Sequence, residues 1–348
     1  MRRPFLVSTV ALAAAIGIFA LTAAEPAVGQ APAVKTAPAA KGFLAPKTPW
    51  GDPDLQGTWT SDDCIGTPMS RPANLGDKLY YTEQEIAQAE SRLAQRAEAD
   101  KQEFIAENAR AGTGPPGHWG ERARRPCKQT SLVVDPPNGR MPDVLPEARN
   151  RPIPDGAGVA APKAESWEDF SYYIRCITRG VTGSILPVIY GNGQEIVQAP
   201  GYVTIFQEMV HEGRVIPLDG RPHSSSSIRT YMGDPRGHWE GNTLVVETTN
   251  FIGGKTGIQG NGNGVPTTDA LKLTERFTRV GPSEIQYEAT IDDPKTYARP
   301  FKVGFPLTQE PGYKNFEYAC HEGNYAMFDS LSGARAMEKR AAEAAAKK

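Results

Sequence analysis

Segments in which apolar and polar residues alternate dominate the chain from about residue 130 onward. In the segment LKLTERFTRV, Leu271, Leu273 and Phe277 fall on one side, whereas Lys272 falls on the other. The segment IQYEATI at residues 285–291 repeats the alternation. This period of two is typical of antiparallel strands that pack one face and expose the other.

The same pattern recurs at short intervals, with Gly, Pro, Asn and Asp between the repeats. We predict strands at residues 131–135, 172–177, 194–198, 202–208, 214–218, 228–232, 243–249, 271–280, 284–292, 301–307 and 316–320. Many short strands with little helix favour a barrel or a sandwich, and closure of a sheet removes exposed edges. We therefore predict a mainly β fold, either a curved antiparallel sheet or a lipocalin-like barrel with an interior pocket.

One helix is predicted before these strands, at residues 83–110. Thr82 followed by Glu85 forms a capping box, and the segment is rich in Glu, Gln, Ala, Arg and Leu. The GTGPPG sequence at residues 112–117 ends it.

The N-terminal residues predict export. Arg2 and Arg3 precede an almost wholly apolar run at residues 5–23, and small residues surround Ala24. This pattern is typical of a secretory signal peptide at residues 1–24, with a membrane anchor as the alternative. Export would place the protein in the periplasm or outside the cell, with no membrane insertion after cleavage.

The remaining domain boundaries follow from composition. Residues 25–48 are rich in Pro and Ala and poor in large apolar side chains, which favours a disordered tether. We expect one β-rich domain at residues 49–335, containing the helix 83–110, and a charged tail at residues 336–348.

The formal net charge of −2 does not point to a charged partner. Removal of Arg2 and Arg3 with the signal peptide would change it to −4. So weak a charge does not indicate nucleic acid or an anionic membrane as the partner, and we expect neither. We expect a small molecule instead, and the sequence does not indicate an oligomeric state.

The four cysteines predict disulfide bonds, because an even number in an exported chain is typical of them. Four cysteines allow three connectivities. We predict that Cys64 pairs with Cys127 and that Cys176 pairs with Cys320. The alternative of a zinc site lacks any Cys-x-x-Cys spacing.

Several long phrases carry a resemblance to a known group of proteins. They are DPDLQGTW, VVDPPNGR, RVIPLDGRPH, MGDPRGHWEGNTLVVETTNF and YACHEGNY. The chain resembles a family of exported bacterial proteins over most of residues 50–335. The resemblance implies an exported protein but no particular activity.

Chemically capable side chains are densest in residues 208–238, EMVHEGRVIPLDGRPHSSSSIRTYMGDPRGH, which hold three of the five histidines. No dinucleotide-binding, P-loop or nucleophile-elbow motif accompanies them. The Gly- and Asn-rich segment 257–264 has no helix after it, which favours a pocket loop over a phosphate cradle. We therefore expect no cofactor. The alternative is a divalent metal held by His211, His223 and His321 with Glu208 and Asp219.

Histidine exchanges protons near neutral pH, so His211, His223 or His321 is the predicted base. Arg229 and Tyr231 lie two residues apart on one predicted strand and would stabilise negative charge in the substrate. The residues that we expect to contact the substrate are Tyr202, Phe206, Asp219 and Glu322.

These features favour a cofactor-independent acid–base enzyme in the periplasm, a lyase or isomerase acting on a small molecule such as a plant-derived aromatic. The first alternative is a non-catalytic periplasmic protein that binds a small ligand in the same pocket. The second is a structural or interaction module of the cell envelope. An enzyme requires the predicted groups to converge on one point.

Overall fold

The structure is a computed structural model that describes residues 43–100, 123–152, 165–310 and 312–347. The predicted signal peptide, residues 25–42 of the predicted tether and residues 101–110 of the predicted helix lie outside these ranges. The described residues all belong to one compact unit.

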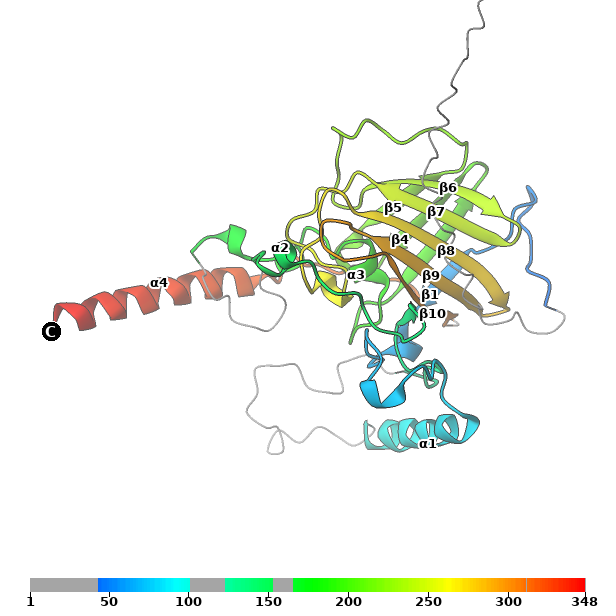
Figure 1. The fold of residues 1–348 in the computed structure, drawn as a ribbon, viewed down its shortest axis with the longest axis horizontal. Helices are drawn as coiled ribbons and strands as arrows, with labels where there is room; N and C mark the ends of the chain where they lie inside the picture. Colours follow the sequence, from blue (N-terminus) through cyan, green and yellow to red (C-terminus); the bar gives the residue numbers. More distant parts are fainter. Residues whose placement is uncertain (1–42, 101–122, 153–164, 311, 348) are drawn as a thin grey trace, which may run out of the picture. The chain divides into compact units, whose positions relative to one another are not determined.

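Ten strands in the described part of the chain form one antiparallel sheet (Figure 1). Their order is β5-β4-β3-β1-β10-β9-β8-β7-β6, and β2 pairs with β10 beside this path. The strands are β1 (Gly57–Thr60), β2 (Val133–Asp135), β3 (Gln194–Ala199), β4 (Tyr202–Gln207), β5 (Gly213–Pro217), β6 (Asp234–Glu240), β7 (Thr243–Thr249), β8 (Lys272–Gly281), β9 (Glu284–Asp292) and β10 (Phe301–Gln309). The sheet curls until it is nearly closed into a barrel, which confirms the predicted fold class.

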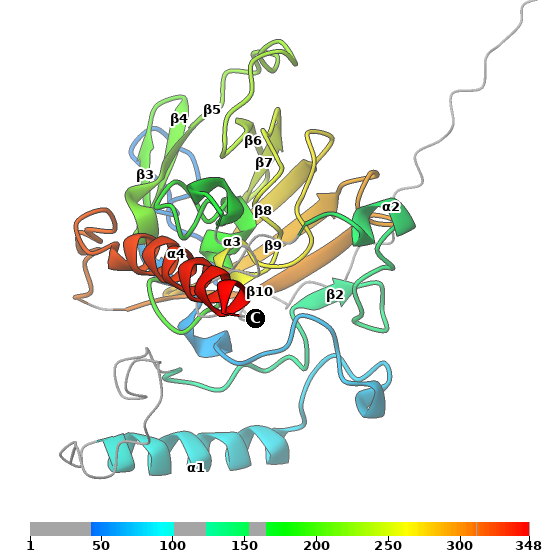
Figure 2. The same ribbon diagram turned by 90° about the vertical axis from the view of Figure 1, so that its left-hand side faces the viewer.

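The two end strands, β5 and β6, meet through side chains. Gly237 of β6 leaves the necessary space, because a Cβ there would lie 2.6 Å from Leu218 and 2.7 Å from Ile216. Figure 2 shows β3–β5 and β6–β9 facing each other across the core. A side chain at residue 237 would force these two groups of strands apart.

Aromatic rings fill the middle of the barrel. Tyr287 of β9 lies with its ring centroid 5.0 Å from Phe277 of β8 and 5.2 Å from Phe305 of β10. All three side chains are fully buried, as is Trp59 of β1. These rings occupy the space where a lipocalin-like fold would hold its ligand, so a ligand site must lie elsewhere.

The helices lie outside the sheet. The α-helices are α1 (Glu83–Asp100), α2 (Pro146–Arg149), α3 (Val181–Ile185) and α4 (Tyr325–Ala346). The 3-10 helices are η1 (Asp62–Cys64), η2 (Ala73–Leu75), η5 (Trp167–Asp169), η6 (Met209–His211) and η7 (Gly260–Gly262). At the start of α1 the Thr82 amide donates to the Glu85 carboxylate at 2.7 Å. Helix α4 crosses the boundary that we expected at residue 335.

Three predicted strands, at residues 172–177, 228–232 and 316–320, are wrong. The first is a series of turns in which Cys176 has φ 55°, a conformation that no strand allows. The second makes only an isolated bridge, between Thr230 and Phe251. Their aromatic and β-branched residues pack against other loops, and propensity alone does not supply a strand partner.

Strand β6 contains Pro235 and Gly237, and it was not among the predicted strands. It lies at one end of the strand order. An edge strand tolerates proline, since its outward N–H needs no partner within the sheet. A turn at Gly241 and Asn242 joins it to β7.

Disulfides join Cys64 to Cys127 and Cys176 to Cys320, as predicted. The second disulfide joins two loops, although we expected it to join two strands. Both disulfides are consistent with an extracytoplasmic protein. In the described part of the chain, the helices are too short or too polar to cross a membrane.

Candidate functional site at one end of the barrel

Helix α3 covers one end of the barrel, and all five of its residues are buried. On one side Gln194 of β3 donates to the carbonyl of Ser184 at 2.9 Å. On the other side Gly183 packs against η7, so closely that a Cβ on Gly183 would lie 2.4 Å from the Gly262 amide. This contact fixes the Gly- and Asn-rich loop against α3.

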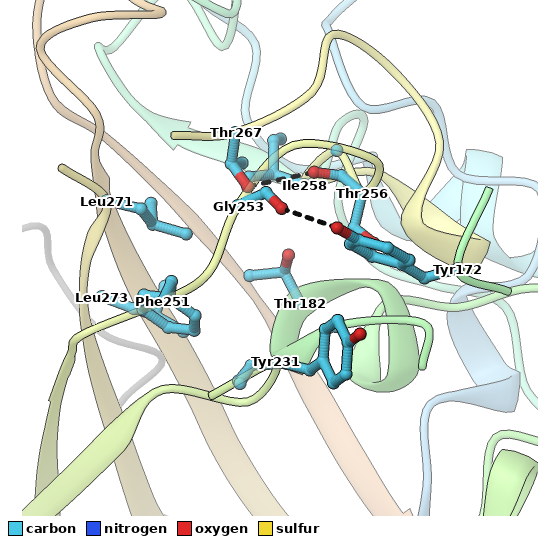
Figure 3. A pocket seen from close by; sticks show the side chains of 13 residues that line it. Tyr172, Thr182, Tyr231, Phe251, Gly253, Thr256, Ile258, Thr267, Leu271 and Leu273 are labelled. Atoms are coloured by element: carbon cyan, nitrogen blue, oxygen red, sulfur yellow. Dashed lines mark hydrogen bonds between the residues drawn. The ribbon is translucent and has the colours of Figure 1, made fainter. Parts of the chain in front are cut away.

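A pocket opens beside α3 (Figure 3). Its lining is mainly apolar, with Tyr172 and Tyr231 on one side and Phe251, Leu271 and Leu273 on the other (Figure 3). The lining residues are Tyr172, Gly180, Val181, Thr182, Tyr231, Phe251, Gly253, Thr256, Gly257, Ile258, Thr267, Leu271 and Leu273. Residues 257–264 were predicted to form a loop beside a pocket, and Gly257 and Ile258 contribute to the lining.

Two tyrosines form the aromatic side of the pocket. The rings of Tyr172 and Tyr231 meet edge to face with centroids 4.9 Å apart. The Tyr172 hydroxyl donates to the Gly253 carbonyl at 3.2 Å, which fixes its ring (Figure 3). Burial and the neighbouring Tyr231 raise the pKa of Tyr172. The Tyr172 phenol is therefore neutral near pH 7, and because its proton is given to Gly253, its oxygen can accept a hydrogen bond from a ligand.

The loop that forms the polar rim is fixed by its own hydrogen bonds. The Thr267 hydroxyl donates to the Thr256 carbonyl at 3.0 Å (Figure 3). The Gly254 amide donates to the Thr267 carbonyl at 2.9 Å. Because these groups are already paired, the pocket is preformed and a ligand need not order the loop on binding.

Glu212, immediately before β5, is a perturbed acid close to this end of the barrel. Burial raises the pKa of Glu212 to about 7, although a hydrogen bond from Thr178 and the charge of Arg214 act to lower it. The Thr178 hydroxyl, which donates to Glu212, also accepts from the Gly180 amide at 2.8 Å. Gly180 lines the pocket, so one hydroxyl connects the pocket wall to a carboxyl that titrates near neutral pH.

A buried ion pair lies deeper in the barrel. Arg214 of β5 donates to Glu275 of β8 at 3.0 Å, and Tyr287 donates to the same carboxylate at 3.1 Å. The side chains of Arg214 and Glu275 are 1% and 0% exposed. Burial acts to lower the pKa of Arg214, but the ion pair with Glu275 raises it overall. The ion pair crosses the interior of the barrel and joins β5 to β8, which are not hydrogen-bonded to each other in the sheet.

The predicted catalytic residues do not converge on this pocket as a group. Tyr231 lines it, whereas the other four have separate surroundings. His223 Nδ1 lies 3.3 Å from Asp234, and Arg229 lies 3.1 Å from Asp269. His211 stacks on Phe206 at 6.5 Å between ring centroids, and His321 is exposed. No hydrogen bond or ion pair joins any two of the five, all of which the structure describes.

The pairing of Arg229 with Tyr231 depended on a strand that does not form. Arg229 donates to the Ser226 carbonyl at 3.1 Å in a turn, while the Tyr231 ring packs on Tyr172. The prediction that both side chains share a strand face is therefore wrong.

The predicted substrate contacts lie outside the pocket lining. Tyr202 and Asp219 form an exposed cluster, in which Arg221 donates to Tyr202 at 3.1 Å and to Asp219 at 2.8 Å. The side-chain hydrogen bond from Arg221 lowers the pKa of Asp219 to about 2. Phe206 packs on His211, and Glu322 is exposed in the loop after Cys320.

The five residues that the sequence offered as metal ligands do not come together in the structure. Within the described ranges, no three side chains of His, Cys, Asp or Glu gather closely enough to hold an ion. Glu208 accepts from Tyr313 and from the amides of Gly193 and Phe316 instead. It thereby fastens the segment before Cys320 to the end of the barrel.

Glu212 was among the chemically capable side chains of residues 208–238 but was given no role, and Thr178 and Arg214 were not predicted to take part in chemistry. Glu212 and Arg214 lie inside the dense stretch 208–238, which was the one available signal. Nothing local distinguishes them from exposed charges, because their properties depend on burial by distant segments.

Comparisons with protein-family models, curated proteins and solved structures find no match.

Proposed function

We propose that the protein binds a small, mainly apolar molecule with an aromatic ring in the pocket beside α3. The observation that carries this proposal is the preformed apolar lining, with its two tyrosines, one phenylalanine and few polar groups. Such a pocket favours a ring that can pack edge to face and accept or donate one or two hydrogen bonds. The two disulfides and the predicted signal peptide favour the periplasm or the outside of the cell as the place of binding.

Binding of p-cresol tests this proposal, because p-cresol combines an apolar ring with a single hydroxyl. We expect saturable binding by isothermal titration calorimetry. Tyr231→Ala should weaken it about five-fold or more, since an aromatic pair contributes about 1 kcal/mol. Tyr231 is 39% exposed, so its removal should leave the fold intact.

Tyr202→Ala is the matched control, because Tyr202 is 40% exposed but lies outside the pocket. It should bind p-cresol as the wild type does. No saturable binding by the wild type, or equal weakening by both variants, would refute the proposal.

A second candidate function is acid–base catalysis by a lyase or isomerase at the same pocket. The observation that favours it is Glu212, whose pKa of about 7 suits a group that takes and returns protons near neutral pH. In this proposal Glu212 replaces the histidines as the base. Glu212 does not itself line the pocket, so it would act through the Thr178 hydroxyl, taking a proton from a carbon next to a carbonyl group of a bound aromatic ketone and then returning it.

Proton exchange in 4-hydroxyacetophenone separates catalysis from binding alone. In D₂O we expect the protein to accelerate the exchange of the methyl protons, measured by ¹H NMR. The base must be ionised, so the rate should rise as the pH increases through about 7. Glu212→Gln should reduce the protein-dependent rate about 100-fold or more.

Glu195→Gln removes a carboxylate at an exposed position of β3 and should leave the rate unchanged. Exchange no faster than in buffer would reject catalysis while leaving the binding proposal intact. Persistence of the exchange in Glu212→Gln would reject Glu212 as the base.

A further inference from the structure

A second pocket lies on the outer face of the barrel and is separate from the first. Two adjacent cross-strand pairs form its floor: Gln286 of β9 opposite Pro306 of β10, and Glu284 opposite Thr308. Their neighbours along each strand, such as Tyr287 and Phe305, point into the core. The floor is therefore as rigid as the sheet itself.

The wall of this outer pocket is a segment held in place by covalent and polar links. Cys127 lies within it and is bonded to Cys64. Arg125 forms an ion pair with the buried Asp63 at 3.1 Å. The Tyr81 amide donates to the Lys128 carbonyl at 2.9 Å, which places Tyr80 at the rim. These links preform the pocket, so binding need not order its wall.

The outer pocket is lined by equal numbers of negative and positive groups and by a hydroxyl group. Asp63 and Glu284 carry negative charges, and Arg125 and Lys128 carry positive charges. Within the described chain the Thr308 hydroxyl has no hydrogen-bond partner, although the residue is only 1% exposed. Leaving a buried hydroxyl unpaired costs free energy, so a ligand that pairs with it gains affinity.

We propose that this outer pocket binds a neutral polyhydroxylated ring, that is, a saccharide unit. Each sugar hydroxyl both donates and accepts, so it can pair with the acceptor Glu284, the donor Lys128 and the hydroxyl of Thr308. The apolar C–H face of the ring would pack on Tyr80 and Pro306. A charged ligand is disfavoured, because the four ionised groups sum to zero.

Saturation-transfer NMR with glucose, galactose, N-acetylglucosamine and myo-inositol tests this proposal. We expect saturable transfer to the ring protons of at least one of these probes. Thr308→Val keeps the shape of the side chain and removes the hydroxyl, so it should fold normally and weaken binding about five-fold, the effect of one hydrogen bond. Tyr80→Ala should weaken binding at least as much.

Two control variants make the same substitutions at positions outside the outer pocket. Thr290→Val changes a residue of β9 outside the outer pocket, and Tyr81→Ala removes the ring that follows Tyr80 without lining the pocket. Both should bind the sugar as the wild type does. No saturable binding of any of the four probes would overturn the proposal, as would binding that Thr308→Val and Tyr80→Ala leave unchanged. Tyr231→Ala should not alter sugar binding, so this result is independent of the aromatic pocket.

Discussion

Replacement of Glu275 by alanine is expected to lower the free energy of unfolding by about 3–5 kcal/mol. The variant leaves the Arg214 guanidinium buried without its counter-charge, and it removes the acceptor of the Tyr287 hydroxyl. Water cannot take the place of the lost carboxylate, because the Arg214 side chain is only 1% exposed. Urea denaturation followed by tryptophan fluorescence or circular dichroism measures the change.

Two controls identify the cause of this loss. The double variant Arg214→Met with Glu275→Leu removes both charges and should recover most or all of the stability, because a buried ion pair can be replaced by apolar side chains without large cost. Glu240→Ala breaks a cross-strand ion pair with Arg276, but that pair is exposed. It should cost less than about 1 kcal/mol. A small loss in Glu275→Ala, or a double variant as unstable as the single one, would contradict the proposed role of the pair.

Removal of the Cys176–Cys320 disulfide is the second large effect that we expect. The bond closes a loop with a sequence separation of 144, and the entropy of closing such a loop corresponds to about 5 kcal/mol. Cys176→Ala with Cys320→Ala should lower the free energy of unfolding by up to about this amount. A reductant would open both disulfides, so the wild type measured in its presence should lose more stability than this variant does.

The other disulfide provides a comparison within the same protein. Cys64–Cys127 has a sequence separation of 63, for which the same relation gives about 4 kcal/mol. Its removal should also weaken sugar binding, because Cys127 lies in the wall of the outer pocket, whereas removal of Cys176–Cys320 should not. Equal sugar binding in both cysteine variants would show that the wall does not depend on its disulfide.

The strands were predictable where the pattern of residues is local and regular. Residues 284–292 form a strand with the predicted bounds, because apolar and polar residues alternate along the whole segment. Residues 243–249 also have the predicted bounds, although Leu244, Val245 and Val246 form a continuous buried apolar run there. The prediction failed at residues 172–177 and 228–232. Those segments have strand-forming residues, but the structure gives them no neighbouring strand with which to pair. A strand requires a partner, and no local pattern contains the partner.

The candidate site was less predictable than the fold. Histidines were the predicted bases because their ordinary pKa lies near neutral pH, yet His211 and His321 are exposed. Glutamate ordinarily titrates near 4.5, and burial at the end of the barrel raises the pKa of Glu212 to about 7. The residue type gave no indication of this shift, because the shift is a property of the surroundings.

The sequence by itself determined the mainly β fold, and the even number of cysteines predicted disulfide bonds but left three connectivities open. Alternation of apolar and polar residues is a local property, and the hydrophobic effect converts it directly into a packed and an exposed sheet face. Only the tertiary structure decided which polar groups became buried: Arg214 meets Glu275 across 61 residues of chain, and Thr308 faces the outer pocket. Burial, pairing and pKa depend on atoms that are distant in the sequence, so they become defined only when the barrel has formed.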